Sequence, residues 1–201
     1  VVGHSVPKSD ALALATGEAR FADDFPHEGF LELALLWSPH AHAEIVSLDI
    51  SEAERVPGVV AIFSAANVPR VLYTSAGQGA PEPSPYDMAL FDTKVRFVGD
   101  RVALVAAESA AAAREAVGKI RVEWKLLPPL FDAETARNED APKIHGGDAY
   151  APLPVPYDPA HNLAGAIAFD FGDCEGAFAR AARVEDHDYR VQYASHCALE
   201  P

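Results

Sequence analysis

Two histidines separated by one residue form the densest group of potential metal ligands in the sequence. His40 and His42 lie in the run S-P-H-A-H-A, and side chains two positions apart project to the same side of an extended segment. They would bind zinc or copper only if further ligands converged on them. The sequence has no second ligand pair of zinc-finger spacing. A local arrangement is therefore favoured, in which Pro39 makes a turn and the imidazoles bond to nearby backbone groups.

A second group of reactive side chains lies at the C-terminal end. His196 and Glu200 are four positions apart, a spacing that puts them on one side of a helix or of an extended segment and suits an acid/base or ligand pair. Cys197 adjoins His196, which could lower a thiol pKa, but neighbours on a strand point to opposite faces. A strand-like run precedes these residues and Pro201 follows them. We therefore expect a structural polar pair and no cysteine nucleophile.

Glycine and carboxylate pairs elsewhere do not predict a site. Gly77-Gln78-Gly79 and Gly146-Gly147 lack the further glycine and following helix of phosphate-binding loops. The adjacent acids Asp23 and Asp24 are typical of solvated charge or of a helix cap. The residues alone thus predict no catalytic, cofactor-binding or metal-binding side chain in this chain.

Composition excludes several classes of partner. The chain has 201 residues, 30 acidic and 16 basic, for a formal charge of −14. Without a run of Lys or Arg, neither nucleic acid nor an anionic membrane is an expected partner, and no apolar run reaches the roughly 20 residues of a membrane span. Cys174 and Cys197 are the only cysteines. So few cysteines indicate a soluble, cytoplasmic protein. Two thiols cannot supply the four ligands of an iron–sulfur cluster.

The elements that would position these side chains alternate between strands and short helices. Residues 30–37 are almost continuously apolar, which predicts a strand covered on both faces. Apolar and polar residues alternate over 44–50, as in a strand. Ser51 and Glu54 form a capping-box pattern, which predicts a short helix. Pro57-Gly58 would end that helix, and a further strand is predicted over 59–63.

A strand–helix–strand unit is predicted over residues 101–126. Val102–Ala107 reads as a buried strand, Ser109 as the cap of an alanine-rich helix over 110–119, and residues 120–126 as a half-buried strand. We expect a βαβ unit with a right-handed crossover.

Proline and glycine recur in the rest of the chain. Residues 75–87 predict a surface loop, and residues 133–162 predict a linker between two domains. Beyond the linker, residues 165–171 alternate, a helix follows Asp173, and 184–194 read as a strand. The predicted class is α+β, with one domain over 1–148 (core about 16–130, then linker) and the start of a second over 149–201. Because the sequence begins without Met and stops after a strand-like run, we expect a piece of a longer polypeptide.

Several segments, taken in order, resemble the large subunit of the molybdenum hydroxylases, the xanthine dehydrogenase and aldehyde oxidase family. The resemblance covers nearly the whole chain, and no single segment carries it alone. Its segments are Thr16–Asp24, Ser38–Ala43, Leu48-Asp49, Val56–Val59, Lys94–Asp100, Val102–Ala106, Val122–Pro128, Phe171–Asp173 and His196–Pro201.

The resemblance implies a fold, a reaction and a set of partners. The part up to about residue 130 would be an α/β hammerhead domain, and residues 149–201 would open the molybdopterin-binding domain. The complete enzyme would hydroxylate a heteroaromatic or aldehyde substrate with oxygen from water at a molybdenum–molybdopterin centre. Electrons would leave through 2Fe-2S clusters and FAD on partner subunits or other domains. The family's base and cofactor loops lie downstream, so Glu200 is not that base and this portion would be structural, inactive alone.

Three alternatives stay open from the sequence. A hydroxybenzoyl-CoA reductase-type subunit resembles the same layout but passes electrons toward its substrate. A stand-alone interaction or metal-binding module would use His40 and His42. An assembly scaffold is compatible with the hydroxylase interpretation.

Overall fold

The computed structural model describes residues 2–25, 28–75, 84–152, 156–166, 168–169, 171–192 and 194. The chain divides into two compact units. One is Leu31–Asp170, and the other combines the end segments Val1–Phe30 and Phe171–Pro201.

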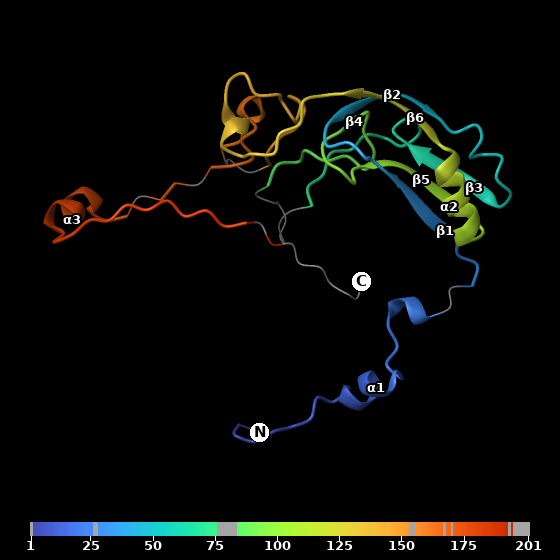
Figure 1. The fold of residues 1–201 in the computed structure, drawn as a ribbon, viewed down its shortest axis with the longest axis horizontal. Coiled ribbons are helices and arrows are strands. Elements are labelled where there is room, and N and C mark those ends of the chain that lie inside the picture. The colour runs from blue at the N-terminus through green and yellow to red at the C-terminus, as the bar shows by residue number, and fades with distance from the viewer. Residues whose placement is uncertain are drawn as a thin grey trace. The chain divides into compact units, whose positions relative to one another are not determined.

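Two antiparallel three-stranded sheets organise the described part of Leu31–Asp170 (Figure 1). Sheet A has the order β1-β5-β3 and sheet B the order β4-β2-β6. Glu32 pairs with Ala107 at one end of β1, and Ala43 pairs with Leu126 at one end of β2. The bounds are β1 Glu32–Trp37, β2 Ala43–Asp49, β3 Val59–Ser64, β4 Lys94–Val95, β5 Arg101–Ala107 and β6 Arg121–Leu126.

Helix α2, Ala110–Lys119, covers one face of sheet A (Figure 1). The Ser109 side chain accepts a hydrogen bond from the Ala112 amide at 3.2 Å, which satisfies one of the free donors of the first turn. Ala113 and Ala116 are buried, and their small side chains let the helix approach the strands closely. The helix and its cap are confirmed as predicted.

The core lies between α2, one face of sheet A and the inner side chains of sheet B. Its buried members pack against half-buried side chains from both sheets, among them Leu36, Leu48 and Val122. Sheets that share a core in this way cannot be stable separately. The buried residues are Ala53, Val56, Ile62, Ala103, Val105, Ala116 and Ile120, with Ala43, Val95 and Val102 in an adjoining cluster.

The opposite face of sheet A carries apolar side chains with much less cover. Successive side chains of a strand alternate between faces, so this face includes Leu33 and Leu35 of β1 with Phe63 of β3 and Leu104 of β5. Leu33 is 62% exposed and Phe63 38% exposed. We call these four residues the open face of sheet A.

Short helices and turns make up the remaining described segments. Asp173 caps α3 by accepting a hydrogen bond from the Gly176 amide at 2.8 Å. No helix in the described residues is long and apolar enough to cross a membrane. The short helices are α1 Ala11–Thr16, η1 Ala22–Asp24, η2 Thr135–Arg137, η3 Pro159–His161 and α3 Cys174–Arg180.

The α+β class is confirmed, but the βαβ crossover is wrong. The strand–helix–strand succession is present, yet β5 lies in sheet A and β6 in sheet B. Every pairing of these strands is antiparallel. Helix α2 therefore connects two sheets instead of crossing over within one.

Three local predictions also fail. Residues 51–55 form turns, because the Ser51 amide bonds back to the Asp49 carboxylate at 2.9 Å and Pro57 follows too soon for a helix. The first strand is covered mainly on one face, as its exposed Leu33 shows. Residues 184–192 form no strand, and α3 ends at Arg180. Most of the predicted loop 75–87 lies outside the described residues.

Candidate functional site

The two histidines of S-P-H-A-H-A have different surroundings. The Ser38 hydroxyl donates to the His40 carbonyl at 2.8 Å and accepts from the His40 amide at 3.0 Å, which fixes a turn around Pro39. The His40 ring lies edge-on to Trp124, with 5.2 Å between centroids.

His42 is a buried, neutral residue at the start of β2. Its ring is 4% exposed, and Nδ1 donates to the Pro128 carbonyl at 2.7 Å. Burial lowers the pKa of His42, and this outweighs the hydrogen bond to Pro128. Its Nε2 has no hydrogen-bond partner among the described residues. These residues also contain no group of three His, Cys, Asp or Glu placed to hold a metal ion.

A network of charged side chains lies where β4 ends. The Oδ2 atom of Asp92 accepts from Arg96 Nη1 at 3.1 Å and from Arg70 Nη2 at 3.3 Å. Burial would raise the pKa of Asp92, but the charges of Arg96 and Arg70 outweigh it and hold that pKa below its ordinary value. Arg70 also pairs with Asp148. One ionised carboxylate therefore joins two segments of the chain.

The same network holds the loop of residues 143–148 against β4. The Lys94 ammonium donates to the carbonyls of Lys143 and Ile144 at 2.8 and 3.0 Å, and Arg96 Nε donates to Ile144 at 3.2 Å. Carbonyl groups that would otherwise face a partly buried space are thereby satisfied.

Asn162 fixes the other side of this loop. Its Oδ1 accepts from the Ile144 amide at 2.9 Å, and its Nδ2 donates to the carbonyls of Ala136 and Pro142 at 2.8 and 3.0 Å. Asn162 has φ +52°, a left-handed conformation that Asn adopts more readily than most residues. The segment predicted as a linker is thus folded on itself around one amide side chain.

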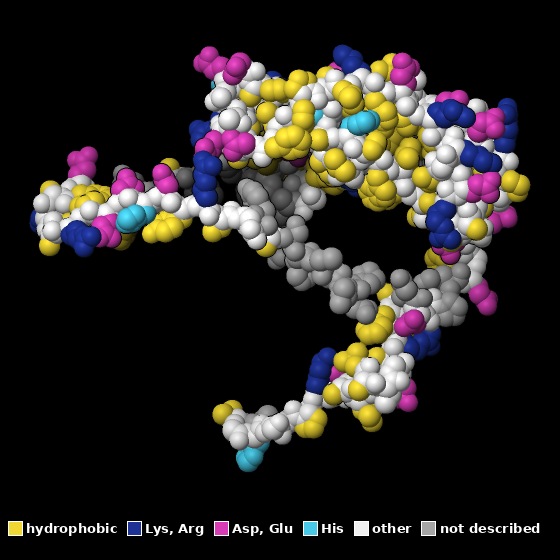
Figure 2. All heavy atoms as spheres, in the orientation of Figure 1, with side chains coloured by type: hydrophobic (Ala, Val, Ile, Leu, Met, Phe, Trp, Pro, Cys, Tyr) yellow, Lys and Arg dark blue, Asp and Glu magenta, His cyan; other side chains and the backbone are white. Residues whose placement is uncertain are grey.

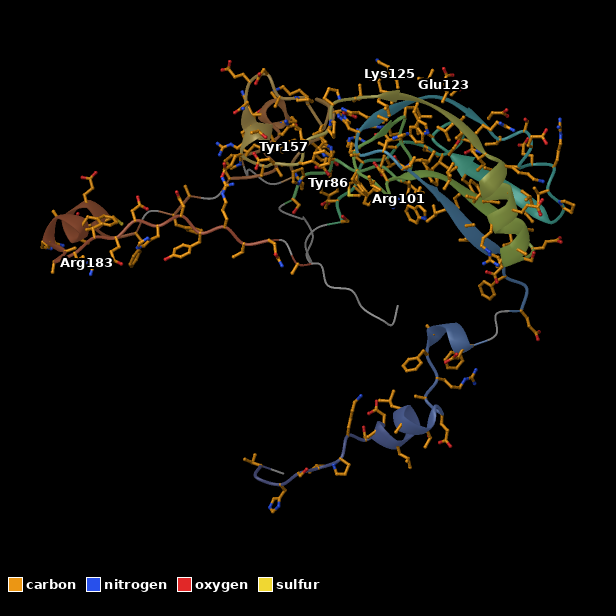
Figure 3. All side chains as sticks on the ribbon, in the orientation of Figure 1. Tyr86, Arg101, Glu123, Lys125, Tyr157 and Arg183 are labelled. Atoms are coloured by element: carbon orange, nitrogen blue, oxygen red, sulfur yellow. The ribbon has the colours of Figure 1, made fainter. Side chains whose placement is uncertain are left out.

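A cavity of about 410 Å³ lies between this segment and residue Asp87. His145 Nε2 is 3.7 Å from Asp87 Oδ2, longer than a hydrogen bond. Burial lowers the pKa of His145 despite the Asp87 charge, so the imidazole is neutral. Burial, helped by Asp87, raises the pKa of Tyr157 (labelled in Figure 3), which stays a phenol.

The remaining sequence candidates are not brought together. Asp24 accepts from the Phe21 amide at 2.9 Å, the capping role that the sequence favoured. Cys174 is an exposed free thiol. The predicted pair His196 and Glu200, with Cys197, lies outside the described residues, as does Gly77-Gln78-Gly79.

Among the described residues, none is assigned to a molybdenum–pterin cofactor. No metal-binding group is present among them. The Asp148 carboxylate, which is paired with Arg70, lies 2.8 Å from the position that a Cβ of Gly146 would take. We therefore assign no step of a reaction to the cofactor in this part of the chain.

Sequence reasoning missed the charged network and the cavity. Asp92 and Arg96 are neighbours in sequence, but their partners Arg70, Ile144 and Asp148 come from distant segments. A weak signal existed in the alternation of charged Lys94 and Arg96 with apolar Val95 and Phe97. This alternation indicates a half-buried strand, but it does not identify the groups that the charged side chains contact.

Comparison with known proteins gives a consistent result. The family model described as "Aldehyde oxidase and xanthine dehydrogenase, a/b hammerhead domain" matches residues 16–128. The probable hypoxanthine oxidase XdhD of Escherichia coli (strain K12) is 35% identical over an alignment of 224 residues. That alignment covers 100% of this chain and 23% of XdhD. The putative xanthine dehydrogenase molybdenum-binding subunit XdhA of the same strain is 37% identical over 195 residues, 95% of this chain and 24% of XdhA.

Solved structures agree with the sequence relatives. The aldehyde oxidoreductase from Desulfovibrio desulfuricans is 34% identical, with a TM-score of 0.59 over 77% of this chain and 17% of that protein. The chain spans about a quarter of the length of the two Escherichia coli relatives.

Proposed function

Because this chain belongs to the aldehyde oxidase and xanthine dehydrogenase family, we propose that it is the N-terminal portion of a molybdenum hydroxylase large subunit. In this proposal residues 1–148 form the α/β hammerhead domain, with its core at about 16–130, and residues 149–201 begin the molybdopterin-binding domain. The role of the portion is to cover and position the cofactor-binding part, and it has no activity alone.

The open face of sheet A is the observation that carries this structural role. Leu33 and Phe63 are exposed apolar side chains on one face of a sheet whose other face is already covered by α2. Figure 2 shows hydrophobic side chains at the surface of the body that holds the two sheets. Apolar side chains gathered on one exposed face are typical of a surface on which another protein surface packs. The remainder of the large subunit is the proposed cover.

The complete enzyme that we propose hydroxylates a heteroaromatic or aldehyde substrate with oxygen from water. The molybdenum–molybdopterin group would supply that chemistry, bound mainly by residues beyond this chain. Electrons would leave through 2Fe-2S clusters and FAD on partner subunits or other domains. The names of the relatives, a hypoxanthine oxidase and a molybdenum-binding subunit, support this assignment. We propose a cytoplasmic location, which the low cysteine content supports.

The test is a charge placed on the open face in the natural polypeptide that carries these residues. Leu33→Asp should leave the hammerhead core intact, because the side chain is 62% exposed in this unit. A carboxylate buried under the rest of the subunit would weaken the packing between the two parts. We expect the molybdenum content per subunit and the turnover of a heteroaromatic or aldehyde substrate to fall together.

A matched control is Val46→Asp, which places the same charge at a 57% exposed valine of sheet B. The control should keep its molybdenum content and turnover. The structural role is wrong if Leu33→Asp retains both, or if the two variants lose them equally.

A further inference from the structure

A second cavity, of about 500 Å³, is lined by the side chains of the charged network. Its lining includes four cationic side chains, Arg70, Lys94, Arg96 and Lys143, but only two carboxylates, Asp92 and Asp148. His145, which also lines it, is neutral because burial lowers its pKa. A concave surface with excess positive charge is unusual in a chain whose formal charge is −14. Such a surface concentrates anions.

Lys94 is a cation of this cavity without a carboxylate partner among the described residues. Its ammonium bonds to two backbone carbonyls, and no carboxylate among the described residues lies within ion-pair distance of it. Glu44, its cross-strand neighbour, is instead engaged by Lys125 at 2.8 Å. Burial and the nearby charge of Arg96 lower the pKa of Lys94, whereas a bound anion would raise it.

Arg96 has donors left for a ligand. Its Nε donates to the Ile144 carbonyl, and its Nη1 donates to the Lys94 carbonyl and the Asp92 carboxylate. Within the described residues its Nη2 makes no hydrogen bond. Its partner Asp92 is shared with Arg70, so a single carboxylate oxygen serves two guanidinium groups. A planar guanidinium beside an ammonium is a common arrangement for holding an oxyanion.

We propose that this cavity binds a small oxyanion, a phosphate or a carboxylate, through Lys94 and Arg96. Loop 143–148 would then be stabilised by the ligand, because Lys94 and Arg96 hold that loop through its carbonyls. The proposal does not depend on the open face of sheet A, so its failure would leave the proposed function untouched.

Hydrogen exchange in the natural polypeptide tests this site directly. Sodium chloride is replaced stepwise by inorganic phosphate, or in a second series by malonate, at constant ionic strength. We expect concentration-dependent protection of the amides in residues 92–96 and 143–148. Protection by phosphate identifies a phosphate site and protection by malonate a carboxylate site, and either supports the proposal. Equal exchange in chloride, phosphate and malonate would overturn it.

Three variants separate charge from packing. Lys94→Met should weaken the apparent affinity by about tenfold or more, the usual effect of losing a charged hydrogen bond. Lys94→Arg keeps the charge and should retain binding, even if the loop shifts. Lys119→Met removes a positive charge from helix α2, where Lys119 pairs with Glu115 at 2.7 Å outside the cavity, and should keep the affinity within about twofold. Equal binding by Lys94→Met and the parent protein would refute the assignment.

Discussion

Asn162 should determine the stability of the segment that follows sheet B. Its amide makes three hydrogen bonds, to Ile144, Ala136 and Pro142. At a net contribution of about 1 kcal/mol for each bond, their loss would destabilise the segment by about 3 kcal/mol. Asn162→Ala would also place a Cβ-bearing, apolar side chain at φ +52°, which costs about 1 kcal/mol more.

The assay is hydrogen exchange of peptides covering residues 133–150 in the natural polypeptide. A loss of about 3 kcal/mol corresponds to an increase in exchange rate on the order of a hundredfold, with the rate in a fully open segment as its upper limit. Asn162→Gly removes the same three bonds without the left-handed strain. It should exchange faster than the parent protein and slower than Asn162→Ala.

Asn162→Asp separates the two halves of the amide. The carboxylate keeps an acceptor for the Ile144 amide but loses both donations, to Ala136 and Pro142. Its second oxygen would face and repel those two carbonyl oxygens, so exchange should be at least as fast as in Asn162→Gly. Parent-like exchange in Asn162→Gly would refute the reasoning, because it would mean that the three bonds add nothing to local stability.

Three shorter predictions concern the core and its edges. Ser109→Ala should lower the free energy of unfolding, measured by chemical denaturation, by about 1 kcal/mol because a helix cap is lost. Ser51 caps no helix, so Ser51→Ala should change it by less than about 0.5 kcal/mol. Ala116→Leu should lower the melting temperature by overfilling the α2 interface, at a cost of about 1–3 kcal/mol, and an unchanged melting temperature would contradict that packing. The folded-state pKa of His42 lies below the unfolded value of 6.5, so the unfolded chain binds more protons in the window just below pH 6.5. Stability should therefore fall as pH drops through that window, and His42→Gln should flatten the dependence in denaturation measured at several pH values.

Local features of the fold were predictable from sequence because their partners lie nearby. Ser109 caps a helix only three residues away, and the alanine run has one dominant conformation. Ser51 shows the limit of the same rule, since its capping-box pattern is present but the Asp49 carboxylate competes for its amide. The placement of β5 and β6 in different sheets was not predictable, because it depends on pairings with distant strands.

The charged network shows why the site was less predictable than the fold. Asp92 could have served as a solvated surface acid, and nothing next to it in sequence indicates Arg70 or Asp148. Asn162 looks like an ordinary turn residue until the loop of residues 143–148 folds onto it. In both cases the chemistry comes from segments that only the tertiary structure brings together.

The long-range pairing of both sheets has a consequence for biosynthesis. Glu32 pairs with Ala107 and Ala43 with Leu126, so each outer pairing closes a loop of more than 70 residues. Such closures lose chain entropy before any strand contact compensates for it, which slows folding. The pairing of β2 with β6 cannot be completed until residue 126 has left the ribosome. Until then the apolar strands of the nascent chain would be exposed. A chaperone would be most needed at this stage of synthesis.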